Sequence, residues 1–351
     1  MAFEIDYIPV GNGESSGDAI ALRYGNLSGP REEQTIVVID GGYKESGEAL
    51  VQHINKYYGT NLVNMAISTH PDADHASGLA VVLEKCKVNQ LLMHKPWNHA
   101  QDIKNMFFDG RITASGPEER LEKSLQDASD LEKLANKNGI EILEPFQGVG
   151  TSDGSMRILG PSLELYESLL LSFKPCPESK GLDIASLFKQ VALKVDEWVE
   201  DNLGIDLLDD DNDQTSAENN TSTIVLFTIE GHKLLFTGDA GKTGLHYAIS
   251  YAESLGIPLT DLNFLDVPHH GSKNNLNSKI LLKIRAQTAF ISASPNDPKH
   301  PSKKVTNALK KLRHAVYVNR SGIICHNFNS PVREGWVPVT EEPFHDKFKD
   351  D

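Results

Sequence analysis

The stretch from Val63 to Leu79 constrains the fold of this chain more than any other. An apolar run with strand character, residues 63–69, stops at His70, and the next residues add Asp72, Asp74 and His75. Carboxylates and imidazoles are costly to bury alone, and loops after buried strands are common positions for metal ligands. The pattern predicts a strand, a metal-binding loop and a helix that begins near Ala76. A solvated polar turn is the alternative when such a motif stands alone.

Two later strands end in residues of the same types. A predicted hairpin of residues 223–229 and 232–237 finishes in T-G-D, which places Asp239 at its end. A strand over residues 264–267 is followed by P-H-H-G-S, which contains His269 and His270. Three strand ends that each deliver His or Asp favour one shared metal site over three unrelated turns.

Three other sequence features are open to more than one interpretation. A strand over residues 35–40 ends in Asp40-Gly41-Gly42, where the carboxylate either supports a metal ligand from behind or belongs to a turn. The Gly-rich residues 11–17 lack the Lys-Ser/Thr and the helix of a phosphate-binding loop, so a turn is favoured. His94 and His99 lie outside any tight ligand spacing and are expected at the surface or beside the substrate.

Charge and hydropathy limit the classes of function. The net charge of −15 argues against binding nucleic-acid backbones without sequence preference, so any phosphate recognition must be local. The first residues show no leader pattern and no run approaches eighteen apolar residues, which predicts a cytoplasmic protein with no membrane partner.

Residues 163–220 have the pattern of a helical insertion. Helices are predicted over residues 163–173 and 182–203, and the second carries an apolar stripe that suits a core or a partner protein. An acidic, solvated loop is expected over residues 209–220. The chain is predicted to close with a helix over residues 302–312 and a hairpin of residues 315–319 and 322–327.

The motifs together resemble the metallo-β-lactamase superfamily, and specifically the hydrolase domain attached to bacterial DNA-uptake (competence) channel proteins. The likeness runs from D-A-I-A-L-R-Y-G at Asp18 through H-P-D-A-D-H, N-N-T-S, T-G-D and P-H-H-G-S to S-A-S-P-N-D-P-K-H-P. It implies an α+β fold, the four-layer αββα sandwich, as one domain over residues 1–351 with the helical insertion at about 163–220.

The resemblance also implies two metal sites at one edge of the sandwich. It assigns His70 and Asp72 to one metal, Asp74, His75 and His270 to the other, and Asp239 to a bridging position. His270 is preferred to His269 because the family's last His directly precedes a Gly. His269 would then face the substrate.

Two departures from the wider superfamily concern the first of these sites. Asp72 stands where others carry a second His, and Asn219, Asn220 and Ser222 stand where others place a His before the T-G-D hairpin. A site richer in oxygen favours manganese, or magnesium, in competition with zinc.

These features favour a metal-dependent phosphodiesterase or nuclease. Two divalent ions roughly 3.5–4 Å apart would activate a shared water as hydroxide, with Asp74 as the base that holds it. His269 and His300 are candidates to stabilise the phosphoryl oxygens or protonate the leaving group, and a surface role for each is the alternative. Hydrolysis of esters, thioesters or lactams on the same scaffold, and a scaffold role in a larger assembly, remain as alternative functions.

Overall fold

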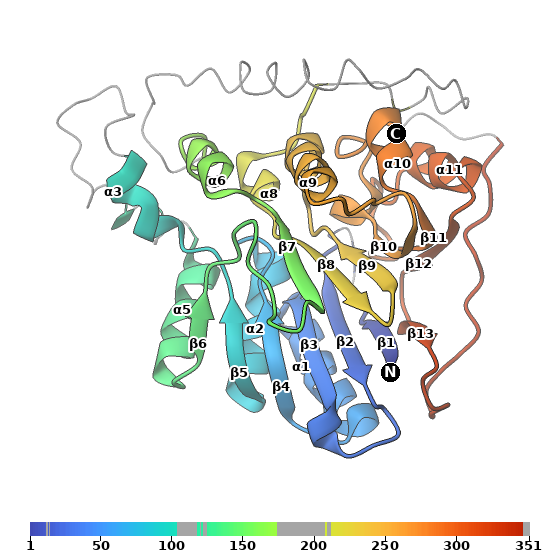
Figure 1. Cartoon of the computed structure of the whole chain (residues 1–351), viewed down its shortest axis with the longest axis horizontal. Helices are drawn as coiled ribbons and strands as arrows, with labels where there is room; N and C mark the ends of the chain where they lie inside the picture. The colour runs from blue at the N-terminus through green and yellow to red at the C-terminus, as the bar shows by residue number, and fades with distance from the viewer. Residues whose placement is uncertain are drawn as a thin grey trace.

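The computed structural model contains two β-sheets that pack face to face with helices on their outer sides (Figure 1). It describes residues 1–11, 13, 15–103, 118–119, 121, 125–173, 208 and 212–346. The helix predicted over residues 182–203, and residues 209–211 of the predicted acidic loop, lie outside the described residues. Within the described ranges, no helix has both the length and the apolar character needed to cross a bilayer.

The first sheet has seven strands and mixes antiparallel with parallel pairing. Its order is β13 (Ile324–Phe328), β1 (Ala2–Tyr7), β2 (Ala19–Gly25), β3 (Gln34–Gly41), β4 (Leu62–Ile67), β5 (Lys87–Leu92) and β6 (Glu141–Leu143). Strands β3 to β6 run parallel to one another, whereas β1, β2 and β13 pair antiparallel.

The second sheet has six strands and the same mixed character. Its order is β12 (Ala315–Asn319), β11 (Ala286–Ser292), β10 (Leu262–Asp266), β9 (His232–Phe236), β8 (Ile224–Ile229) and β7 (Met156–Gly160). Strands β9 to β12 are parallel. The predicted hairpin is confirmed as β8 and β9, which pair antiparallel around the turn between Ile229 and His232.

Three apolar cores bind these layers together. Aromatic side chains such as Phe3, Phe227 and Phe264 fill the space between the two sheets. Outside the first sheet, a second core includes residues of α1 (Lys44–His53), α2 (Ala73–Lys85) and α5 (Gln126–Lys137). Outside the second sheet, a third core includes residues of α9 (Lys242–Ser254), α10 (Ser278–Lys283) and α11 (Lys303–Lys311). The predicted α+β, four-layer αββα architecture is confirmed.

Three further α-helices of the described residues lie on the side of the molecule shown at the top of Figure 1. They are α3 (Ala100–Ile103), α6 (Leu163–Leu170) and α8 (Ala217–Asn220). A solvated loop was expected up to Asn220, but Glu218, Asn219 and Asn220 form α8 and are buried. The Ser216 hydroxyl accepts a hydrogen bond from the Asn219 amide and caps this short helix.

The parallel strands bring the predicted ligands to one place. Carboxyl ends of parallel strands meet at the same edge of a sheet. Asp40 lies at the end of β3, His70 follows β4, Asp239 follows β9, and His269 and His270 follow β10. The edges of the two sheets that carry these ends face each other, so the fold alone assembles the cluster.

Two sequence predictions about local structure are wrong. The final strands do not form a hairpin, because β12 pairs parallel with β11 in the second sheet while β13 pairs with β1 in the first. The helix after His70 begins at Ala73 and not near Ala76, so Asp74 and His75 lie in its first turn. An acidic side chain is favourable there because the helix amino terminus carries partial positive charge.

Close backbone contact between β3 and α2 fixes the position of that first turn. The Gly78 amide donates a hydrogen bond of 2.8 Å to the Gly42 carbonyl. A Cβ atom at Gly78 would overlap the Gly41 carbonyl oxygen and lie 2.6 Å from the Tyr43 carbonyl oxygen. Only glycine lets α2 approach the end of β3 so closely.

Gly78→Ala should therefore lower the free energy of unfolding by about 2 kcal/mol, a usual cost of overpacking. It should also lower metal content, because His75 lies one turn earlier in α2. Urea unfolding and elemental analysis measure the two effects. Gly322→Ala is the control, since a Cβ there meets nothing within 4 Å and its φ is ordinary. Equal stability of both variants would contradict the close-packing argument.

Candidate metal centre

The buried Asp239 carboxylate lies at the centre of four imidazoles. Its Oδ2 atom is 3.8 Å from Nε2 of His70 and 3.6 Å from Nε2 of His269. Its Oδ1 atom is 3.5 Å from Nε2 of His75 and 3.7 Å from Nε2 of His270. The two oxygens thus divide the cluster into a first half-site on the Oδ2 side and a second half-site on the Oδ1 side.

The first half-site is open, and the carboxylates of Asp72 and Asp239 both face His70 there. Asp72 Oδ2 lies 3.8 Å from His70 Nε2, and the Asp72 side chain is 43% exposed. Asn219 Nδ2 donates a hydrogen bond of 3.2 Å to Asp239 Oδ2. Asn219 therefore occupies the region where the sequence comparison placed the missing His.

The second half-site is compact. Asp74 Oδ2 is 3.9 Å from His75 Nε2. Asp74, His75 and His270 each offer one potential ligand atom, and these three atoms lie within 4.8 Å of one another. The structure therefore brings together all six residues expected to hold metal, with the tighter group at this half-site.

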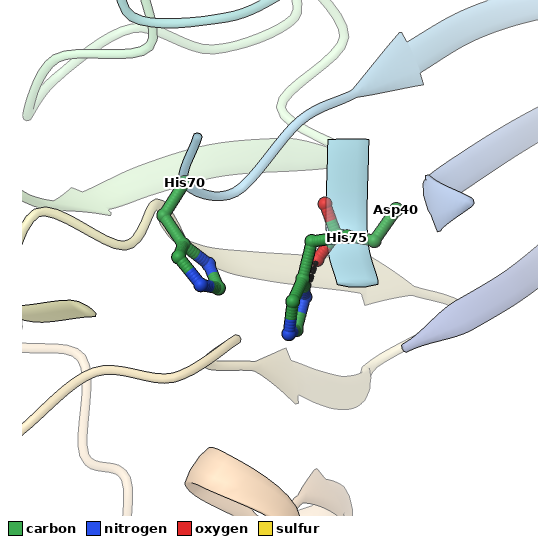
Figure 2. A group of neighbouring side chains, drawn as sticks. All are labelled: Asp40, His70 and His75. Atoms are coloured by element: carbon green, nitrogen blue, oxygen red, sulfur yellow. Dashed lines mark hydrogen bonds and ion pairs between the residues drawn. The ribbon is translucent and has the colours of Figure 1, made fainter. Parts of the chain in front are cut away.

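Two carboxylates orient the imidazoles from behind. Asp40 Oδ2 lies 2.8 Å from Nδ1 of His75 and also accepts a hydrogen bond from the Thr69 hydroxyl. Figure 2 shows the His70 and His75 rings side by side with Asp40 behind His75. Asp18 lies 3.6 Å from Nδ1 of His270 and 3.9 Å from Nδ1 of His75. Such contacts fix ring orientation and leave Nε2 free for a metal.

The unsatisfied polar atoms of this cluster fit a metal centre. His70 Nε2, His75 Nε2, His270 Nε2 and Asp239 Oδ1 are buried without a hydrogen-bond partner among the described residues. Buried polar atoms are normally paired, because leaving one unpaired is costly. Metal bonds of about 2.0–2.2 Å place neighbouring ligand atoms roughly 3.3–3.6 Å apart, close to the separations found here. The residues present therefore fit two divalent ions that share Asp239.

The pKa shifts of the side chains at the centre also fit a site that binds cations. Burial would raise the pKa of the Asp239 carboxyl, but the surrounding imidazoles hold it well below its usual range. Burial disfavours the charged form of His270, yet Asp239 and Asp18 raise its pKa to about 9. The pKa of His75 is also raised, against burial, by Asp239, Asp40 and Asp74. The carboxylates thus attract cations, and metal binding would displace protons from these rings.

The loop after β10 holds its two imidazoles through an uncommon backbone conformation. His269 and His270 have φ values of 49° and 54°, in the left-handed region that residues with a Cβ rarely adopt. The His269 amide donates a hydrogen bond of 3.1 Å to the Gly238 carbonyl, and Asn275 Oδ1 lies 3.0 Å from His269 Nδ1. Strain of this kind persists where the surrounding structure fixes the side chains, which is typical of functional sites.

His300 borders the same centre. Its ring centroid is 5.4 Å from that of His269 and 5.9 Å from that of His270. Its Nδ1 atom lies 2.9 Å from Asp297 Oδ2, and Asp297 accepts a second hydrogen bond from the Ser16 hydroxyl. The Asp297 contact leaves Nε2 of a partly exposed imidazole available beside the cluster.

His94 and His99 were expected at the surface or beside the substrate, and the surface position is wrong. His94 is buried and stacks on Tyr166. His99 is also buried, with its two ring nitrogens 3.1 Å from Glu144 and 3.2 Å from Glu167. Since carboxylates already satisfy both nitrogens, the contacts of His99 need no bound ion, although His99, Asp102 and Glu167 have ligand-type proximity.

Sequence reasoning missed three carboxylates that support the centre. Asp18 precedes β2, whose antiparallel register opposes Ala19 to Gly41 and so places Asp18 beside the end of β3. Asp266 accepts hydrogen bonds from the Tyr7 hydroxyl and the Thr237 amide and so fixes the turn before Asp239. Asp297 orients His300. The signal available was an acidic residue at the start of an apolar strand for Asp18 and at the end of one for Asp266.

The sequence model of the metallo-beta-lactamase superfamily matches residues 31–294. The chain belongs to this superfamily. The resemblance expected from the motifs is confirmed, and with it a metal-dependent hydrolase in the general sense.

Two curated relatives share 30% identity with short parts of the chain. ComE operon protein 3 of Bacillus subtilis aligns over 107 residues, 30% of this chain, and Recombination protein 2 of Haemophilus influenzae over 121 residues, 34% of this chain. These alignments span 13% and 14% of the two relatives. The matched region is thus a small part of each.

The solved structures to which the chain is similar include two that are named as metallo-beta-lactamases, one from Thermotoga maritima and one from Cronobacter sakazakii. The first has a TM-score of 0.34 and 10% identity, and the match covers 68% of this chain and 79% of that one. The second has a TM-score of 0.30 and 10% identity, with 66% and 58% covered.

If two metals share Asp239, the Asp239→Ala variant should lose most of its bound metal. The Asp74→Ala variant should lose only metal from the second half-site. Elemental analysis after reconstitution with zinc or manganese measures both. Asp261→Ala is the matched control, because that carboxylate is exposed and pairs with Lys233 away from the centre. Equal metal content in all three variants and the parent would rule out the centre.

Proposed function

We propose that this protein is a metal-dependent phosphodiesterase or nuclease. The observation that carries the proposal is the first half-site, where the carboxylate of Asp72, at a position that carries a His in others of the superfamily, faces His70 beside Asp239. Such a site suits harder ions such as manganese or magnesium, which bind phosphoryl oxygens well. The name of one relative, Recombination protein 2, agrees with a nucleic-acid substrate.

Bound at the two half-sites, divalent ions would supply an activated water and stabilise charge on the phosphoryl oxygens. His70, Asp72 and Asp239 would hold one ion, and Asp74, His75, His270 and Asp239 the other. Asp40 and Asp18 would keep the rings oriented from behind. Zinc competes with manganese for this ligand set, and magnesium is compatible with its carboxylates.

The other polar side chains of the centre would move protons and contact the substrate. Asp74 is 28% exposed, so it can accept a proton from the attacking water. His269 faces Asp239 Oδ2 at the open half-site, where it can donate to a phosphoryl oxygen. His300, oriented by Asp297, can protonate the leaving oxygen from Nε2.

Manganese should activate cleavage of a phosphodiester reporter at least as well as zinc. Asp72→His should abolish the manganese activation and retain zinc activity, because an added imidazole softens the first half-site. Steady-state rates after chelation and addition of each metal measure this. Turnover of a lactam, ester or thioester reporter without phosphodiester cleavage would instead establish the alternative hydrolase. A metal-loaded protein inactive on every reporter would favour the scaffold role.

His300→Ala should slow cleavage of a dinucleotide about 100-fold, the usual size of a general-acid effect. It should change cleavage of a p-nitrophenyl phosphodiester much less, because p-nitrophenolate leaves without a proton. Asp297→Asn should give a smaller loss in the same direction. His345→Ala is the control, since that partly exposed imidazole contacts Glu342 in the C-terminal segment. Equal losses on both substrates would assign His300 a role in binding or folding.

A further inference from the structure

A cavity of about 530 Å³ opens between the Gly-rich segment and the start of α1. Its walls include Ile8, Pro9, Gly11, Gly13, Tyr43 and Glu45. This volume lies within the usual range of small-molecule sites, about 300–1,000 Å³. None of the functions assigned above uses the cavity.

The cavity adjoins the metal centre through backbone contacts on two sides. On one side, a Cβ atom at Gly17 would overlap the Asp74 carbonyl oxygen and lie 3.0 Å from Asp74 Cβ. On the other, the Tyr43 carbonyl lies against Gly78, three residues beyond His75 in α2. Burial and the nearby Asp74 carboxylate both raise the pKa of the Tyr43 phenol. The walls of the cavity therefore lie directly against the part of α2 that carries Asp74 and His75.

The wall formed by the Gly-rich segment is tied to the loop that carries His300. The Ser294 amide donates a hydrogen bond of 2.9 Å to the Ser16 hydroxyl oxygen. Ser16 in turn donates to Asp297 Oδ2, the atom that orients His300. The Ser292 hydroxyl donates to the Gly17 carbonyl at 2.6 Å. These bonds hold the wall in a fixed position relative to the leaving-group side of the centre.

The chemistry of the walls suits a flat, uncharged ring with a polar edge. Ile8, Pro9 and Ala49 are apolar, and the half-buried Tyr43 ring has no aromatic partner among the described residues. Ser15, Ser46 and the exposed Glu45 supply polar atoms. The lining residues that the structure describes include no Lys or Arg, so the walls offer nothing for a second phosphate.

We propose that this cavity binds the nucleobase of a nucleotide whose phosphodiester lies at the metal centre. The proposal rests on the phosphodiesterase function proposed above and specifies its substrate as a nucleic acid or nucleotide. Tyr43 stacks on the base, as aromatic side chains do in proteins that bind single strands. Glu45 accepts a hydrogen bond from an N–H group of the base edge. Gly11, with a φ of 79°, gives the base a wall without side chains.

Two esters with the same leaving group test the proposal: the p-nitrophenyl ester of thymidine 5′-monophosphate and ethyl p-nitrophenyl phosphate. The metal-loaded parent should prefer the thymidine ester in kcat/KM. Tyr43→Ala should lower this preference about 10-fold, mainly through KM, because stacking is lost. Tyr43→Phe should retain it. Tyr247→Ala is the matched control, since Tyr247 is a half-buried tyrosine on α9 outside the cavity lining.

The outcomes separate this proposal from the function on which it rests. Hydrolysis of both esters with a preference that Tyr43→Ala leaves unchanged would overturn the cavity assignment and keep the phosphodiesterase. Hydrolysis of neither ester would overturn the phosphodiesterase. Equilibrium dialysis of thymidine against the metal-free protein then tests whether the cavity binds a nucleobase. Binding that is lost in Tyr43→Ala and kept in Tyr247→Ala supports the proposal. Absence of binding to the parent protein overturns it.

Discussion

The structure depends on one buried carboxylate that serves two groups of ligands. Asp239 belongs to the second sheet, and its Oδ2 and Oδ1 atoms face His70 and His75 from the first sheet. The same atoms face His269 and His270 from its own sheet. A buried anion that is costly to desolvate is tolerated only with cationic partners close by. The alignment of the two sheets at this edge and the capacity to bind metal therefore have the same physical origin.

Three carboxylates behind the centre hold its imidazoles and Asp239 in position. Asp40 and Asp18 hold ring nitrogens on the far side of the rings, and Asp266 holds the turn that carries Asp239. Together they raise the negative charge of the site, which protons or metal ions must balance. Burial raises the pKa of Asp266, and the nearby Asp18 raises it further, so the outer carboxylates do not all carry full charge.

The two half-sites differ in a way that bears on substrate choice. The second is compact, with ligand atoms of Asp74, His75 and His270 close together, whereas the first is open, with Asp72 exposed and Asn219 beside Asp239. His300 lies beside the imidazoles of the centre, and hydrogen bonds tie its loop to the Gly-rich wall of the cavity beside Tyr43.

The sequence by itself determined the strands and helices around the centre and the strand ends that carry its His and Asp side chains, because apolar periodicity and the residue types that follow are local signals. The four layers and the expected assignment of six of these residues to two metals came from the resemblance to the superfamily. The sequence did not determine the partners of the last strands, since β12 and β13 look like a hairpin locally and only the competition between two sheet edges separates them. Nor did it reveal Asp18, Asp297 or Tyr43. Their roles depend on strand register, on a hydrogen bond across a loop and on a cavity wall, all of which exist only after distant segments pack together.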